Sequence, residues 1–381
     1  MGGEGKILRG QSSESDPRAA VQEFHAAVAQ DDIALVVFFC SSAYDLKALA
    51  EEMNLRFTGA RVVGCTSAGE IGPVGYIERS LTGASFPSSE FSVEVAHMDD
   101  LEHFLMSEGQ DVSRALVREM ESRPSGLGTG DSFALLLIDG LSLREEQVAR
   151  AFQNGLGAIR LFGGSAGDDM KFERTLVFYD GAFRENAAVL AMMTTALPFK
   201  IFRTQHFVTE NERLVVTEAD AAHRIVREIN GLPAAAEYAR IVGVSVEELR
   251  PALFAANPVV VVIDGTDYVR SIQKVNDDGS LTFYSAIDEG LVLRVARGGD
   301  LIANLNQAFA ALREEVGPPQ LVIACDCILR NLEITQKGLK DDVGEIMRRN
   351  DVIGLSTYGE QIDGVHVNQT LTGIAIGCPR A

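Results

Sequence analysis

Three segments of this chain repeat one order of elements, and that repeat limits the possible folds more than any other feature. Each segment opens with a short apolar run, passes through a helical stretch and reaches a second apolar run. The first runs are residues 35–40 (LVVFFC), 134–139 (ALLLID) and 321–325 (LVIAC). Because self-similarity along a chain marks repeated structural units, we expect three copies of one strand–helix–strand unit.

Each second apolar run leads into a glycine turn that contains a serine and ends in an acidic residue. The turns are residues 64–70 (GCTSAGE), 163–168 (GGSAGD) and 354–360 (GLSTYGE). Their glycines are expected to permit tight turns with positive φ. Their acids are expected to bond to backbone N–H groups or to face a polar ligand.

This unit predicts an α/β fold with mixed sheets and outer helices. The first strands lack alternation, so we expect them to be buried on both faces, and each crossover to be parallel. Residues 179–182 (YDGA) predict a hairpin between antiparallel strands. Residues 196–299 do not follow the repeat. The predicted fold is therefore three strand–helix–strand–glycine-turn units plus an inserted α+β segment, divided into domains at 18–195 and 196–381.

Local signals add detail to this prediction. Residues 220–230 have the pattern of a helix that ends before a glycine, and residues 171–178 have the pattern of a strand that follows the second turn. Three aspartates stand where the helix before each first strand should begin. The expected N-caps are Asp16, Asp111 and Asp300.

The composition is that of a globular protein and argues against two kinds of partner. The 34 basic and 54 acidic residues give a formal net charge of −20, which disfavours nucleic acid or an anionic membrane surface. No apolar run approaches the length of a membrane span, and residues 1–16 carry no apolar signal core. The five cysteines do not form a disulfide framework. We therefore expect a cytoplasmic protein.

Residues 163–167 match the Gly-x-Ser-x-Gly pattern, in which a hydrolase exposes a nucleophilic serine between a strand and a helix. Here a strand is expected to follow, and the turn is one of three. A serine hydrolase using Ser165 is therefore a less favoured alternative, and we assign no catalytic residue. The acidic end of each turn also opposes phosphate binding.

Cys325 and Cys327 form a Cys-x-Cys pair at the end of a predicted buried strand. Alternation would point both thiols to the same side of the sheet. Two ligands are too few for a structural zinc site. Zinc that bridges two chains and a redox disulfide remain alternatives to two soft, buried core residues.

His206 lies in residues 199–208 (FKIFRTQHFV), which we expect to form one strand. Alternation would place Phe202 and His206 on one face and Arg203 on the other. An aromatic strand with one histidine and nearby basic residues could hold a haem, since a single histidine can be its axial ligand. The same strand could equally be a core element with a hydrogen-bonded histidine.

Several motifs, in order along the chain, resemble those of FIST-domain sensory proteins. The N-half signatures are residues 63–71 (VGCTSAGEI) and 162–169 (FGGSAGDD). The C-half signatures are residues 230–234 (NGLPA), 358–361 (YGEQ) and 366–370 (HVNQT). The resemblance covers about residues 20–380. It implies a FIST N half followed by a FIST C half, with a sensory, non-enzymatic role.

Within that family the chain resembles the nitric-oxide-sensing haem proteins (NosP), on residues 38–41 (FFCS), 70–76 (EIGPVGY) and 204–207 (TQHF). This resemblance implies haem b with His206 as the iron ligand and with Phe202 and Arg203 beside the cofactor. It also implies bacterial signalling in which nitric oxide is sensed and a histidine kinase or a cyclic-di-GMP enzyme is controlled in trans. A homo-oligomer is compatible with the sequence.

The other FIST hypothesis is recognition of a small ligand such as an amino acid. That ligand would contact polar side chains of the three turns and of the segment after the third turn. These candidate pocket residues are Ser67, Glu70, Ser165, Asp168, Tyr358, Glu360, His366 and Asn368.

Overall fold

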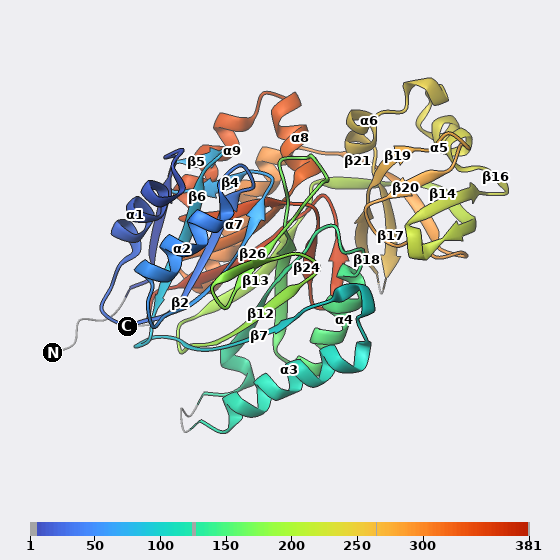
Figure 1. The fold of residues 1–381 in the computed structure, drawn as a ribbon. Coiled ribbons are helices and arrows are strands. Elements are labelled where there is room, and N and C mark those ends of the chain that lie inside the picture. The colour runs from blue at the N-terminus through green and yellow to red at the C-terminus, as the bar shows by residue number, and fades with distance from the viewer. Residues whose placement is uncertain (1–5, 124–126, 264, 380–381) are drawn as a thin grey trace.

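The computed structural model describes residues 6–123, 127–263 and 265–379. In this part of the chain, three six-stranded mixed sheets pack together and helices cover their outer faces (Figure 1). The predicted α/β class and the three repeated units are confirmed. The inserted segment lies to one side of this core as a smaller lobe, drawn in yellow and olive in Figure 1.

The first two copies follow one another without interruption. The elements of the first copy are β1 (Leu8–Ser12), α1 (Pro17–Val28), β2 (Ile33–Ser41), α2 (Leu46–Arg56), β3 (Arg61–Ser67), β4 (Glu70–Gly72), β5 (Gly75–Ile77) and β6 (Leu81–Pro87). The elements of the second are β7 (Ser92–Met98), η1 (Leu101–His103), α3 (Met106–Glu121), η2 (Thr129–Asp131), β8 (Ser132–Ile138), α4 (Glu145–Leu156), β9 (Arg160–Ser165), β10 (Val177–Tyr179), β11 (Ala182–Arg184) and β12 (Ala188–Thr194).

The third copy is split by the insert. Its elements are β13 (Phe199–Thr204), α7 (Leu301–Val316), β22 (Pro319–Cys327), α8 (Ile328–Gln336), α9 (Lys340–Arg349), β23 (Val352–Thr357), β24 (Glu360–Ile362), β25 (Val365–Val367) and β26 (Leu371–Gly377). The insert comprises β14 (Phe207–Asp220), η3 (Ala221–His223), β15 (Ile225–Ile229), β16 (Leu232–Pro233), α5 (Ala234–Val242), η4 (Val246–Glu248), α6 (Pro251–Ala256), β17 (Val259–Ile263), β18 (Thr266–Arg270), β19 (Ile272–Val275), β20 (Leu281–Phe283) and β21 (Val292–Gly298).

Each sheet is completed by a hairpin from another copy. The two central strands of each copy are parallel, as predicted, in the pairs β2–β3, β8–β9 and β22–β23. The hairpin that follows then crosses to a different sheet. Hairpin β4–β5 extends the third copy at β23, β10–β11 extends the first at β3, and β24–β25 extends the second at β9. The three copies are thus interlocked in a closed ring.

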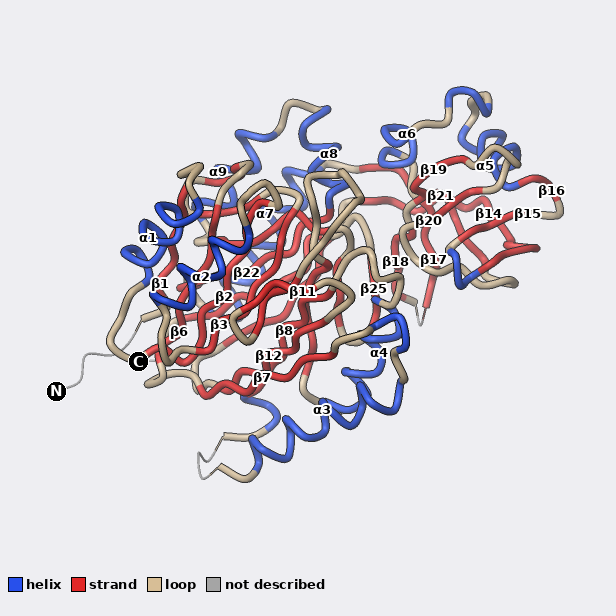
Figure 2. The backbone as a smooth tube through the Cα atoms, viewed as in Figure 1, coloured by secondary structure: helices blue, strands red, loops and turns tan. Residues whose placement is uncertain are grey.

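The strands that open each copy are buried on both faces, as predicted. Alternate residues of β2, such as Val37 and Phe39, enter one central core shared by all three sheets. Their neighbours Val36 and Phe38 face α1 and α2. The strands β8 and β22 divide their side chains in the same way, and Figure 2 shows the strands gathered inside the helices.

The helices carry the expected caps at two of three positions. Asp16 and Asp300 accept backbone N–H groups of Ala19 and Ala303, each at 2.9 Å. The third expectation is wrong, because Asp111 lies inside α3, which begins at Met106. Among the described residues, no helix combines the length and apolar character needed to cross a membrane.

Three further local predictions are wrong. Residues 220–230 form the short 3-10 helix η3 and strand β15, because β15 pairs with β14, β16 and β20 of the insert. Residues 199–208 are two strands broken at Gln205 and His206, since β13 joins β26 of the core and β14 joins β21 of the insert. The second turn is followed by an irregular loop at residues 168–176, before the short strand β10.

The repeated glycine that starts each turn is needed for close packing and not for positive φ. A Cβ on Gly163 would lie 2.0 Å from the carbonyl oxygen of Leu136 on the neighbouring strand. Gly64 and Gly354 face Phe38 and Ala324 in the same way, at 2.5 and 1.9 Å. Among the glycines of the three turns, Gly69 has a positive φ, of 132°.

Gly163→Ala is therefore expected to destabilise the protein, by about 1–3 kcal/mol, because the new methyl group forces β8 and β9 apart. Gly130→Ala is the matched control, since its Cβ would meet no atom within 4 Å. Urea unfolding of both variants measures the difference. Equal unfolding midpoints would contradict the close-packing explanation.

Candidate functional site

The three glycine turns meet at the centre of the ring and bond to one another through backbone groups. Ala68 N–H donates to the Ser356 carbonyl at 2.9 Å, and Ser356 N–H donates to Gly69 at 2.7 Å. Ser165 N–H donates to the Gly359 carbonyl at 2.8 Å. Similarly, Gly167 N–H donates to Thr66 at 3.0 Å. The structure thus brings together turns that are nearly 300 residues apart in the sequence.

Glu70 and Glu360 occupy equivalent places in this ring. Glu70 accepts the Ser67 hydroxyl and the N–H and hydroxyl of Ser80, the latter two at 2.9 and 2.8 Å. Glu360 accepts the N–H and hydroxyl of Thr370 at 3.1 and 2.6 Å. Burial outweighs these bonds and raises the pKa of Glu70 to about 7 and that of Glu360 well above its usual range. Both acids therefore support the turns and are closed to solvent.

Asp168 differs from these two acids, although the sequence aligns it with them. It organises the loop 168–176 by accepting the N–H groups of Phe172, Glu173 and Arg174 at 2.8–2.9 Å. The Tyr358 hydroxyl also donates to it. The first and third copies have no such loop, so the second copy breaks the threefold pattern at this point.

The loop and the insert together enclose a cavity of about 160 Å³ beside the third turn. Its aromatic wall includes Phe172 and Tyr358, whose stacked rings lie 4.5 Å apart, and Tyr284 of the insert. Its polar wall includes Glu145 at the start of α4 and Arg224 of the insert. The cavity therefore lies between the core and the insert.

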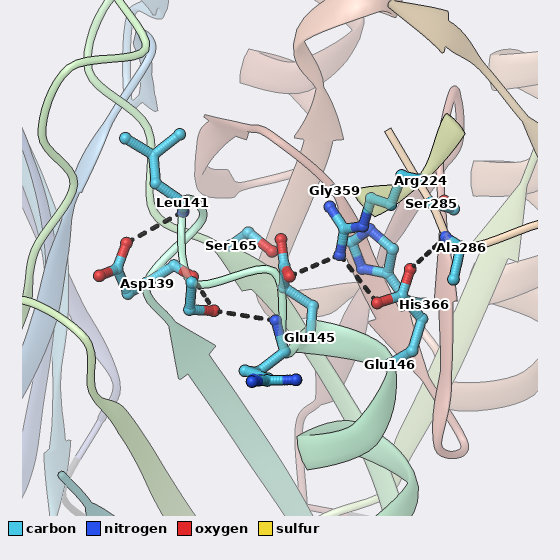
Figure 3. A network of polar contacts seen from close by, with 12 residues as sticks. Asp139, Leu141, Glu145, Glu146, Ser165, Arg224, Ser285, Ala286, Gly359 and His366 are labelled. Carbon is cyan, nitrogen blue, oxygen red and sulfur yellow. Dashed lines mark hydrogen bonds and ion pairs between the residues drawn. The ribbon is translucent and has the colours of Figure 1, made fainter. Parts of the chain in front are cut away.

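A buried ion network crosses this junction (Figure 3). Arg224 Nη2 lies 2.7 Å from Glu145 Oε2 and 2.8 Å from Glu146 Oε2. Glu146 also accepts the N–H of Ala286 in the insert, at 2.8 Å. Burial raises the pKa of Glu145 to about 7, because the ionised carboxyl is costly there. Glu146 is half-buried, and the neighbouring His366 and Arg224 together with the Ala286 backbone bond hold its pKa below the usual range.

His366 of the third hairpin lies next to this network. Burial lowers its pKa to about 4, so its ring is neutral at pH 7. Gln361 Nε2 donates to His366 Nδ1 at 3.1 Å and to Ser165 Oγ at 2.9 Å. A Cβ on Gly359 would lie 2.1 Å from the His366 ring, so that glycine allows the ring to pack against the turn.

The polar side chains around His366 are incompletely bonded within the protein. Gln361 Oε1, Asn368 Nδ2 and Gln369 Oε1 are buried and have no hydrogen-bond partner among the described residues. Asn368 uses its other amide atom to accept the Ser285 hydroxyl of the insert at 2.6 Å. Buried polar groups of this kind are usually satisfied by ordered water or a ligand.

Three residues that line the cavity have left-handed backbone conformations. The φ angles of Leu143, Phe172 and Arg224 are 57°, 54° and 58°. For bulky residues this region is unfavourable, and each such residue costs about 1–3 kcal/mol. Strain of this kind is often found at functional sites, and three of the thirteen non-glycine residues with positive φ in the described ranges line this cavity.

A larger space of about 620 Å³, here called the vestibule, adjoins the cavity. Leu141, Leu143 and His223 line both spaces. The vestibule lies between the loop after β8, the loop 168–176 and η3. A small ligand could therefore place one end in the aromatic cavity and extend its other end toward solvent.

His206 is buried where the insert joins the core, away from this cavity. Its Nδ1 accepts Arg330 Nη1 at 3.3 Å and its Nε2 lies 3.0 Å from Glu333 Oε1. Because arginine can only donate, the proton is assigned to Nε2, which donates to Glu333. Neither ring nitrogen is free to bind iron, so His206 does not fit a haem ligand in this conformation.

The other residues assigned to a haem site lie apart from His206. Phe202 packs against Phe309 of α7, with ring centroids 6.3 Å apart. Arg203 stacks over the ring of Tyr268, 4.5 Å from its centroid. Both line a surface groove of about 550 Å³ along β13 and α7, and His206 does not.

The cysteine pair does not fit a zinc site. Cys325 faces the central core, whereas Cys327 packs beside Tyr358 in a separate cluster. Burial raises the pKa of both thiols well above the usual value, which disfavours the thiolate that a metal requires. No group of three or more His, Cys, Asp and Glu side chains is arranged to hold a metal in the described ranges.

Sequence reasoning identified part of this junction and missed the rest. Tyr358, His366 and Asn368 were found through the third turn. Glu145 and Arg224 were missed, because one stands in an unremarkable helix and the other lies within residues 220–230, which were wrongly predicted as a helix. Phe172 was missed because its loop was predicted to be a strand. The adjacent pair Glu145–Glu146 at a helix start was the available signal.

Comparison with known proteins now places the chain in a family. The FIST N domain model matches residues 34–232 and the FIST C domain model matches residues 234–363. The chain therefore belongs to the FIST family, whose domains are generally sensory domains for small ligands.

Other comparisons are distant or negative. No curated protein matches the chain. Among solved structures, that of cyanuric acid hydrolase from A. caulinodans aligns over 98% of this chain and 99% of its own, with 9% identity and a TM-score of 0.35. That similarity is too low to assign an activity.

The raised pKa of Glu70 makes a prediction about pH. Its folded pKa of about 7 exceeds the usual 4.5, so the folded state binds more protons between these values and stability falls as pH rises through that window. Glu70→Gln removes this fall. Between pH 4.5 and pH 8, we expect the free energy of unfolding of the unchanged protein to fall by about 1–3 kcal/mol more than that of the variant.

Urea unfolding across this pH range measures the gain. Glu78→Gln is the control, because that carboxyl is exposed and its pKa is lowered by Lys340. Parallel stability–pH curves for Glu70→Gln and the unchanged protein would contradict the assignment.

The His206 geometry makes a prediction about haem. Because both ring nitrogens are bonded within the protein, haem added to the purified protein should give no Soret band that depends on His206. The comparison is an absorption titration of the unchanged protein and His206→Ala. A stoichiometric band that is lost in His206→Ala would overturn this conclusion and support the haem hypothesis drawn from the sequence.

Proposed function

We propose that this protein is a sensory protein that binds one small organic molecule, such as an amino acid, at the junction between core and insert. The observation that carries this proposal is the cavity between Tyr358, Phe172, Glu145 and Arg224. Its volume of about 160 Å³ suits a molecule smaller than those held by pockets of about 300–1,000 Å³. Its mixture of apolar walls and few polar groups is typical of small-molecule sites.

The position of the cavity supports a sensory role. A ligand there would contact α4 and the third turn on one side and the insert on the other. The insert joins the core through two neighbouring connections, and Gly299 N–H of one donates to the His206 carbonyl of the other at 2.7 Å. A ligand that binds one orientation of the insert better than another would shift their populations.

Ser165 gives no support to the hydrolase alternative. Its hydroxyl is buried and accepts a hydrogen bond from Gln361. His366, the nearest histidine in this network, is bonded to Gln361 and not to Ser165.

The test is a thermal-shift screen with amino acids, followed by calorimetric titration of the compounds that stabilise the protein. Phe172→Ala should weaken their binding about tenfold or more, because it removes one wall of the cavity. Met170→Ala, in the same loop but outside the cavity, is the control. Binding that is unaffected by Phe172→Ala would place the ligand elsewhere.

Haem binding, nitric oxide sensing and control of a histidine kinase or a cyclic-di-GMP enzyme remain predictions from the sequence resemblance. The partner in trans would have to recognise a surface that changes with the position of the insert. Measuring kinase activity with and without the bound ligand would test that part of the hypothesis.

A further inference from the structure

The junction cavity and its vestibule are lined by more acidic than basic side chains. Glu145 and Arg224 line the inner cavity, and Glu146 also bonds to Arg224. In the vestibule, acidic residues outnumber basic ones. Its acidic residues are Glu102, Asp139, Glu173 and Glu185, and its arginines are Arg144 and Arg174.

Arg224 does not offer an anion site, although it lines the cavity. The same guanidinium nitrogen, Nη2, is bonded to both Glu145 and Glu146. Its single positive charge therefore already faces two carboxyls, and a carboxylate that reached the remaining guanidinium N–H groups would lie beside both acids. The like charges would repel at short range in a buried setting.

Glu145 is the carboxyl that remains available to a ligand. Arg224 bonds to its Oε2, and no other residue in the described ranges bonds to its side chain. The residue is 2% exposed, so its ionised form is poorly solvated. A ligand cation beside it would compensate that charge, whereas an anion would add a second one.

The aromatic wall favours the same sign of charge. Phe172 and Tyr358 are stacked 4.5 Å apart, and Tyr284 lies 6.3 Å from Phe172, measured between ring centroids. Ring faces attract cations through their quadrupole, by about 0.5–1 kcal/mol at exposed sites and more where water is excluded. A carboxyl among several rings is therefore an arrangement that recognises ammonium or guanidinium groups.

We propose that the group recognised at this junction is a side-chain cation, the terminal ammonium or guanidinium of a small ligand, which Glu145 binds among the rings of Phe172, Tyr284 and Tyr358. This inference rests on the proposed ligand site. It adds the chemical class of the ligand and excludes dicarboxylates and other anions as the recognised compounds.

The experiment is calorimetric titration of the unchanged protein with L-lysine, L-norleucine and L-glutamate. Lysine and norleucine differ in the terminal ammonium, and glutamate carries a second carboxylate in its place. We expect lysine to bind at least about tenfold more tightly than glutamate, with norleucine between them. This comparison needs no variant, so it remains decisive if a substitution at the junction fails to fold.

Glu145→Gln then tests the residue. The variant should reduce the preference for lysine over glutamate at least about fivefold, a ratio that a general loosening of the junction would not change. Glu108→Gln on α3, exposed and remote from the cavity, should keep the preference. An unchanged preference in a folded Glu145→Gln variant would overturn the role of that carboxyl.

The outcomes separate this inference from the proposed function. Glutamate binding as tightly as lysine, with both weakened by Phe172→Ala, would overturn the cation class and keep the site. Lysine binding that is insensitive to Phe172→Ala would show that lysine binds elsewhere, and would overturn both the proposed site and the cation class for that ligand. No binding of the three compounds at millimolar concentration would overturn the proposal of a cationic amino-acid-like ligand.

Discussion

The exchange of hairpins between the three copies is the constraint on which the rest of the structure depends. Each glycine turn carries its chain out of one sheet and into the next. The turns must therefore meet at one point, where backbone bonds such as Ala68 to Ser356 and Ser165 to Gly359 hold them. This closed ring explains why the turns are rich in glycine and small polar residues, since only such residues allow three backbones to approach.

A threefold ring offers three equivalent corners, and the junction cavity lies at one of them. Two additions produce this difference. The loop 168–176 brings Phe172 against Tyr358, and the insert between β13 and α7 brings Arg224 against Glu145. The candidate site is thus built from residues that depart from the repeat, supported by residues that follow it. Glu70 and Glu360 belong to the second kind, and their buried, closed positions identify them as supports.

The sequence predicted those parts of the fold that depend on local pattern. The apolar runs, the parallel crossovers and the hairpin at residues 179–182 follow from periodicity and turn chemistry, and the structure has them. The exchange of hairpins could not be predicted, because no local signal tells a strand which sheet it joins. Residues 220–230 were predicted as a helix, yet pairing with β14 makes part of them a strand. His206 was predicted to lie within one strand. The break at its position arises because β13 pairs with β26 of the core and β14 pairs with β21 of the insert, and the local sequence does not show this change of partner.

The exchange also has a consequence for how the chain is made. Strand β4 pairs with β23, so Ile71 finds its partner Gly354 only after most of the chain has left the ribosome. The β4–β5 hairpin therefore has no sheet to join until β23 is made, and the sheet of the first copy lacks its edge hairpin until β10 of the second copy is made. Synthesis order and folding order therefore differ, and a fragment containing the first copy alone would expose the strands that the later copies cover.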